Sequence, residues 1–141
     1  MKRFIEKAIQ RRNPKFKFDP EISFLMLLEL TTQLTFNLMR GFLKTAIWGK
    51  YAKGLTLEQN VKLKYLNKIE FGRFVKIGES SLLSGLGKEG IRIGNNSGIG
   101  AFSRVEVCQT FHDLGAYIHI GDHVGIGPYA SLGGAGGLSI G

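Results

Sequence analysis

Residues 91–105 read IRIGNNSGIGAFSRV, and residues 118–132 read IHIGDHVGIGPYASL. Both stretches repeat an aliphatic residue at every sixth position. An α-helix turns by about 100° per residue, so six steps rotate a side chain by about 240° and cannot keep these residues on one face. Three such steps do return to the starting direction. The spacing therefore predicts an all-β solenoid, in which each coil has three flat sides formed by brief strands and rises by about 4.8 Å.

The same spacing extends through most of residues 54–141. Three coils supply the expected core positions, here called the lattice residues: Phe71, Ile77, Leu83; Ile93, Ile99, Val105; Ile120, Ile126, Leu132. A glycine directly follows the lattice residue at each first and second step: Gly72, Gly78, Gly94, Gly100, Gly121, Gly127 and Gly141. We interpret these glycines as corner residues that accept positive φ. Four residues after the same lattice positions stand small or β-branched side chains: Val75, Ser81, Ser97, Ser103, Val124 and Ala130.

Extra residues interrupt the coils at one place only. Coil starts at residues 71, 93, 120 and 140 are 22, 27 and 20 residues apart, which exceeds 18 by 4, 9 and 2 residues. All three insertions follow the third step, so the loops should gather along one edge, where function is expected. Upstream, Leu57 and Leu63 begin a first coil that is incomplete or distorted.

Charge and glycine content divide the chain near Gly54. Residues 1–53 contain 11 Lys/Arg, 4 Asp/Glu and 2 glycines, whereas residues 54–141 contain 8 Lys/Arg, 7 Asp/Glu and 18 glycines. We therefore expect a basic, amphipathic helical arm over 1–53 and the solenoid over 54–141. The single cysteine, Cys108, excludes an internal disulfide framework and fits a reducing compartment.

The arm contains the signals of a long helix. Asp19-Pro20-Glu21 is typical of a helix N-terminus, and apolar residues predominate from there to Trp48, with one narrow polar stripe. Glu29 interrupts the apolar run, which favours a helix lying in a membrane surface over one that spans the membrane. Seven basic residues in positions 1–17 suit an anionic leaflet, so residues 1–48 are a candidate membrane contact. The alternative is that the apolar face packs on the solenoid wall or on a neighbouring subunit. Nucleic-acid binding is not expected, because no binding motif accompanies the basic residues.

The repeats in residues 54–141 resemble those of the hexapeptide-repeat acyltransferases, and in particular the bacterial sugar and polysaccharide O-acetyltransferases. The resemblance implies a left-handed parallel β-helix and a homotrimer with CoA bound between subunits. It also implies transfer of an acetyl group from acetyl-CoA to a hydroxyl of a sugar or cell-surface polysaccharide precursor. The reaction would take place in the cytoplasm or on the inner face of the membrane.

The catalytic histidine of this family follows a complete hexapeptide coil, and in this sequence Ile140-Gly141 opens that coil. We therefore expect the histidine beyond Gly141, an incomplete chain, and no activity from the 141 residues alone. His112, beside Asp113 in the longest insertion, is the remaining candidate. The stretch beneath the acceptor pocket of the family is matched by the substrate-binding candidates: Tyr129, Ser131, Gly133 and Gly134. No metal is expected.

Two other functions are compatible with the sequence. A carbonic-anhydrase-like metal enzyme of the γ type could use His112, His119 and His123, since imidazole is a common zinc ligand. His119 and His123 flank a lattice residue, however, and both are expected on the outer surface. The second alternative is a non-catalytic β-helical scaffold anchored by its arm.

Overall fold

The computed structural model describes residues 2–141, which form two α-helices, one short 3-10 helix and twelve strands. Contacts divide the chain into two compact units, Met1–Phe36 and Asn37–Gly141. The second unit thus begins inside a helix, ahead of the compositional boundary near Gly54. Within residues 2–141, neither helix combines the length and the apolar character needed to cross a bilayer.

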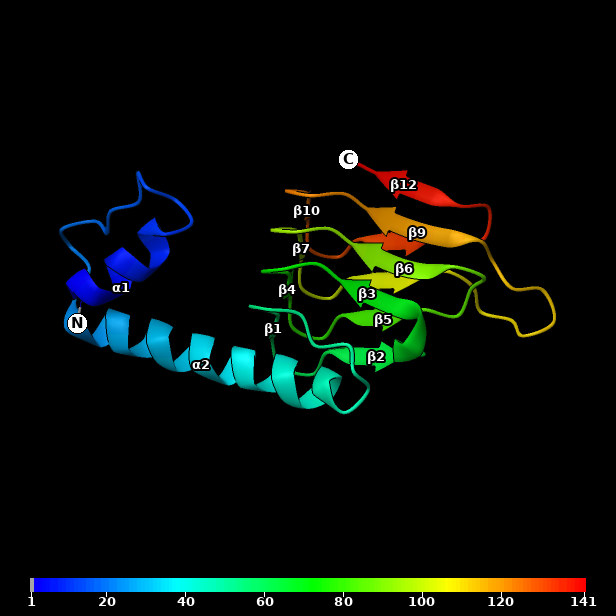
Figure 1. Cartoon of the computed structure of the whole chain (residues 1–141), viewed down its shortest axis with the longest axis horizontal. Helices are drawn as coiled ribbons and strands as arrows, with labels where there is room; N and C mark the ends of the chain where they lie inside the picture. Colours follow the sequence, from blue (N-terminus) through cyan, green and yellow to red (C-terminus); the bar gives the residue numbers. More distant parts are fainter. Residues whose placement is uncertain (1) are drawn as a thin grey trace. The chain divides into compact units, whose positions relative to one another are not determined.

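Twelve strands of the second unit form three parallel, four-stranded sheets (Figure 1). Sheet A contains β1 (Thr56–Leu57), β4 (Lys76–Ile77), β7 (Gly98–Ile99) and β10 (Gly125–Ile126). Sheet B contains β2 (Lys62–Lys64), β5 (Leu82–Ser84), β8 (Arg104–Glu106) and β11 (Ser131–Gly133). Sheet C contains β3 (Ile69–Phe71), β6 (Gly90–Ile93), β9 (Tyr117–Ile120) and β12 (Leu138–Ile140). The chain visits A, B and C in turn, so it winds as a parallel, β-helix-like coil.

The lattice residues pair with one another in the sheets, as the six-residue spacing predicted. Ile77, Ile99 and Ile126 are partners in sheet A, and the equivalent lattice residues are partners in sheets B and C. Leu57 and Leu63 join the same columns in sheets A and B. Most of these side chains are buried in a single apolar core that fills the inside of the coil.

The insertions lie at the corner between sheets B and C, as predicted. Residues 85–89, 107–116 and 134–137 each connect a strand of sheet B to the next strand of sheet C. In the first coil this corner is formed by a 3-10 helix, η1 (Leu66–Lys68). The first coil also lacks a sheet C strand ahead of β1, which makes it incomplete.

The corners are built differently from the sequence-based interpretation. Positive φ is adopted by non-glycine residues three positions after the lattice residues of sheets A and C: Asn60, Ser80, Phe102, Tyr129, Phe74, Asn96 and His123. The glycines that directly follow the lattice residues do not adopt it, apart from Gly141. Positive φ was therefore the wrong explanation for those glycines.

Close contact between coils explains the glycines instead. A Cβ atom on Gly100 would collide with the backbone nitrogen of Pro128 in the next coil, and one on Gly78 would collide with the backbone of Ala101. Because backbone atoms cannot move aside as the end of a flexible side chain can, only glycine fits at these positions. Glycine is therefore needed here because no space for a side chain remains between adjacent coils.

Buried serines bind adjacent coils to each other. The Ser97 hydroxyl donates to the carbonyl oxygen of Gly121 at 2.6 Å and accepts from the amide of Val124 at 3.0 Å. Ser103 makes the same pair of contacts with Gly127 and Ala130, at 3.3 and 3.2 Å. Of the small residues predicted at these corners, Val75, Ser81, Ser97 and Ser103 are buried, whereas Val124 and Ala130 in the last coil are half-buried. The hydroxyls of Ser97 and Ser103 satisfy backbone groups of the following coil.

The arm contains two helices where the sequence predicted one. Helix α1 (Lys2–Gln10) was not predicted, although Phe4, Ile5, Ala8 and Ile9 recur at helical spacing on one face; none of its residues is buried. Helix α2 (Phe24–Ala46) begins later than predicted. Asp19 forms a local turn by accepting from the Glu21 amide at 2.8 Å, and the hydroxyl of Ser23 caps α2 by accepting from the Met26 amide at 3.2 Å.

The last turns of α2 pack on the first coil inside the second unit. Gly41 lies so close to the carbonyl group of Leu55 that a Cβ atom would collide with it, and Thr45 is fully buried. After Ala46 the chain turns away from the helix at Gly49, whose φ is +66°, and the Lys50 amide donates to the Thr45 carbonyl at 3.0 Å. Packing on the solenoid wall thus accounts for one face of this part of the helix, and other apolar side chains of α2 remain exposed.

We predict that Gly100→Ala lowers the free energy of unfolding of the 141-residue chain by about 2 kcal/mol, because the added methyl overpacks the contact with the next coil. Gly127→Ala is the matched control, since Gly127 follows the next lattice residue of sheet A and a Cβ atom there meets nothing within 4 Å. Urea unfolding of the two variants measures the difference. Equal loss in both would contradict the close-contact explanation.

Candidate functional site

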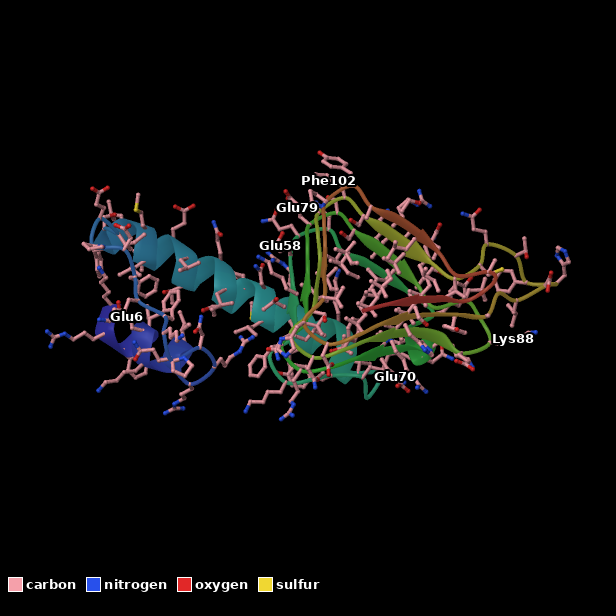
Figure 2. All side chains as sticks on the ribbon, turned by 90° about the horizontal axis from the view of Figure 1, so that it is seen from above. Glu6, Glu58, Glu70, Glu79, Lys88 and Phe102 are labelled. Atoms are coloured by element: carbon pink, nitrogen blue, oxygen red, sulfur yellow. The ribbon has the colours of Figure 1, made fainter. Side chains whose placement is uncertain are left out.

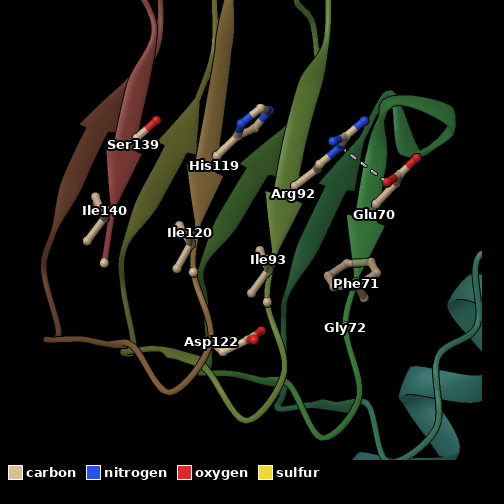
Figure 3. Close-up of a pocket in the computed structure, with 13 residues that line it drawn as sticks. Glu70, Phe71, Gly72, Arg92, Ile93, His119, Ile120, Asp122, Ser139 and Ile140 are labelled. Atoms are coloured by element: carbon tan, nitrogen blue, oxygen red, sulfur yellow. Dashed lines mark ion pairs between the residues drawn. The ribbon is translucent and has the colours of Figure 1, made fainter.

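A row of polar side chains crosses the outer face of sheet C. Glu70, Arg92, His119 and Ser139 are successive partners in the sheet, one on each strand (Figure 3). Each directly precedes a lattice residue, and side chains alternate between the two faces of a strand. The row therefore points outward while the lattice side chains fill the core. A shallow hollow of about 590 Å³ lies over this row.

Opposite charges meet at one end of the row. The Arg92 Nε atom lies 3.4 Å from the Glu70 Oε2 atom, and both side chains are 61% exposed. An ion pair with this exposure contributes little to stability, since water and salt screen it. Both groups therefore remain accessible to a ligand that forms hydrogen bonds.

His119 has a more enclosed environment than the surface position predicted for it. Its side chain is 32% exposed, and its ring centroid lies 4.3 Å from that of Tyr117. The Nε2 atom is 3.3 Å from the Glu89 Oε2 atom, yet it has no well-aligned hydrogen bond and is shielded from solvent. The Glu89 carboxylate thus lies beside the imidazole without a hydrogen bond to it.

Asp122 also borders the hollow but has a structural role. Its Oδ1 atom accepts from the backbone amide of Asn95 at 2.6 Å. The side chain of Asn95 in turn accepts from the amide of Arg73 at 2.8 Å. These two residues form a ladder that links three coils at the corner between sheets C and A.

The predicted substrate-binding residues are spread along the last coil. Tyr129 stands at the corner between sheets A and B, is 77% exposed, and stacks on Phe102 with the ring centroids 5.3 Å apart. Glu58, Glu79 and Phe102 project from the same corner (Figure 2). Ser131 and Gly133 lie on β11, and Gly134 is buried at the next corner, where it bonds the amides of Ala116 and Tyr117. None of these four residues lines the hollow over sheet C, and their role in binding stays a prediction.

The three histidines lie on different elements. His112 is exposed in the loop of residues 107–116, His119 lies on β9, and His123 is an exposed corner residue. Within the described residues 2–141, no group of three or more His, Cys, Asp or Glu side chains could hold a metal ion. This geometry does not favour the metal-enzyme alternative.

Cys108 lies at the base of the same loop, where its sulfur contacts Thr110. The Thr110 hydroxyl lies 3.5 Å from the Cys108 Sγ atom, and the Thr110 amide donates to this sulfur at 3.3 Å. These hydrogen bonds, with that of the Thr110 side chain contributing most, lower the pKa of the Cys108 thiol.

Sequence reasoning missed the polar row, although it contained the signal. Residues directly before the lattice positions of one side must share one outer face, which places Glu70, Arg92, His119 and Ser139 together. The position of Glu89 beside His119 could not be predicted, since Glu89 lies in an insertion whose path the spacing does not determine. Comparison with protein-family models, curated proteins and solved structures found no match for this chain.

We predict that alkylation of Cys108 by iodoacetamide has a pH midpoint below the ordinary thiol value of about 8.5, because the thiolate is the reactive form. Thr110→Val should raise the midpoint by removing the hydroxyl that stabilises the thiolate. Thr110→Ser retains the hydroxyl and serves as the control. Identical midpoints in the valine and serine variants would refute this explanation of the lowered pKa.

Proposed function

We propose that the protein is an O-acyltransferase that moves an acetyl group from acetyl-CoA to a hydroxyl of a sugar or cell-surface polysaccharide precursor. We further propose that its coil is a left-handed β-helix of hexapeptide repeats. The observation that carries both proposals is the register of the lattice residues, which pair every coil with the next in three parallel sheets. This regularity supports the resemblance on which the proposed activity rests.

The proposed reaction is a nucleophilic attack by the acceptor hydroxyl on the thioester carbonyl carbon of acetyl-CoA. A carbon–oxygen bond forms, the carbon–sulfur bond breaks, and CoA leaves as the thiol. A general base accepts the hydroxyl proton, and a backbone N–H stabilises the oxyanion. The resemblance gives the role of base to a histidine that none of His112, His119 and His123 matches, so we assign it to none of them.

The hollow over sheet C is the proposed place where the reactants meet. It holds a carboxylate, a guanidinium, an imidazole and a hydroxyl in one row, a donor and acceptor set suited to a ligand rich in hydroxyl or phosphate oxygens. Its volume of about 590 Å³ is within the usual range for small-molecule sites. In a homotrimer, a neighbouring copy would close such an open face into a cleft. Tyr129 and Ser131 remain candidates for contact with the acceptor.

The donor implies a location for the reaction. Acetyl-CoA is a cytoplasmic metabolite, so we place the protein in the cytoplasm or on the inner face of the membrane.

We predict that Arg92→Ala raises the KM for donor or acceptor by about 10-fold or more in the full-length protein, because a hydrogen bond to a charged group contributes about 1.5 to 3 kcal/mol. Release of CoA in the presence of acetyl-CoA and a panel of sugars provides the assay.

Arg104→Ala is the matched control for this experiment. Arg104 lies on the outer face of sheet B, is 62% exposed and pairs with Glu106 at 3.2 Å, so it loses the same charge in a similar setting. Turnover of the Arg104 variant should stay within about twofold of the unmodified protein, the range of an ordinary surface substitution. Equal effects of both substitutions would remove the hollow over sheet C from the proposed site.

A further inference from the structure

A second hollow, of about 630 Å³, lies between the end of helix α2 and the first strand of sheet B. It belongs entirely to the second compact unit. Three lysines and two aromatic residues dominate its lining: Lys44, Lys62, Lys64, Trp48 and Tyr65. No carboxylate lines it. We call it the basic hollow.

The fold holds the positive charges of Lys44, Lys62 and Lys64 around the basic hollow without placing an acidic side chain against them. Lys62 and Lys64 point outward from β2, because Leu63 between them belongs to the lattice. Their partners on the neighbouring strand β5 are the uncharged Leu82 and Ser84. The Lys44 Nζ atom donates to the Val61 carbonyl at 2.6 Å, which holds a third ammonium group beside them.

None of these three lysines forms an ion pair with a carboxylate in the part of the chain that the structure describes. Three unpaired cations around one hollow attract an anionic partner.

Large apolar side chains lie beside these charges. Ile47 is 87% exposed and Trp48 is 65% exposed, directly after the last turn of α2. Leu43, one turn earlier, is also exposed. Tryptophan is enriched where membranes meet water, since its ring is apolar and its N–H needs a polar partner. Lysine chains extend over such a boundary with their methylenes in the apolar layer and their charge in water.

We propose that the basic hollow docks the protein on an anionic phospholipid bilayer, with the lysines at headgroup phosphates and Ile47 and Trp48 in the interfacial layer. A soluble phosphate would engage the lysines but leave both apolar side chains in water, whereas a lipid surface satisfies both sets of residues. The sequence placed membrane contact on residues 1–48, and the structure adds the first coil to that contact. The proposal does not depend on acyl transfer, which is assayed with soluble acceptors.

Trp48 makes the docking directly measurable, because it is the single tryptophan of the 141 residues. Its emission should shift to shorter wavelength when vesicles of phosphatidylcholine mixed with phosphatidylglycerol are added. Vesicles of phosphatidylcholine alone should produce a much smaller shift. Added salt should reverse the binding, since it screens the attraction between exposed charges.

The double variant Lys62→Ala/Lys64→Ala should bind the anionic vesicles about 10- to 30-fold more weakly, since each basic residue near an anionic surface contributes about fivefold. Arg73→Ala/Lys88→Ala is the matched control, because it removes two positive charges from exposed positions outside the basic hollow. This control should bind within about twofold of the unmodified chain, since surface changes away from a site have small effects. Circular dichroism checks that both variants are folded.

Three results would overturn the proposal. Equal weakening in the two double variants would show that net charge, and not the basic hollow, drives the binding. Sedimentation with vesicles without a shift in Trp48 emission would place the contact on another surface. A Trp48 shift with inorganic phosphate, in the absence of any vesicle binding, would identify a site for soluble anions.

Discussion

Successive coils approach each other so closely at their corners that a side chain there would collide with the backbone of the next coil. Gly72, Gly78, Gly94 and Gly100 all meet this condition. The approach is set by the hydrogen bonds of parallel sheets, which fix the distance between neighbouring strands. The corners are built to keep that distance between coils. Corner residues with positive φ, such as Asn96, reverse the chain direction tightly, and the buried Ser97 hydroxyl satisfies backbone groups of the following coil.

This constraint leaves only certain places for function. The inside of the coil is filled by the lattice side chains, and in the described residues two of the three corners carry no insertions. Chemistry must therefore use the outer faces of the sheets, the open corner between sheets B and C, or the end where α2 packs. The polar row on sheet C and the basic hollow occupy two of these places. Each combines residues that are adjacent in the sheets but distant in the sequence.

The lattice could be predicted because a period of six grouped in threes has one geometric meaning, and each lattice residue faces its partner in the structure. The corner glycines were recognised, but the sequence cannot distinguish a need for positive φ from a need for space. Helix α1 was missed although Phe4, Ile5, Ala8 and Ile9 recur at helical spacing, because residues 1–17 were interpreted by their basic charge alone. Asp19 and Ser23 are both capping residue types, and only the backbone shows that Ser23 begins α2. Glu89 approaches His119 from an insertion, and the six-residue spacing of the lattice cannot predict the path of an inserted loop.

The proposed acetyl transfer requires that the protein bind coenzyme A, with the open hollow on sheet C as the proposed site. Calorimetric titration with desulfo-coenzyme A tests this requirement most directly. The proposed trimer has three equivalent clefts, so we predict saturable binding of one coenzyme A per chain. An absence of binding by the folded protein would contradict this proposal and favour the non-catalytic scaffold.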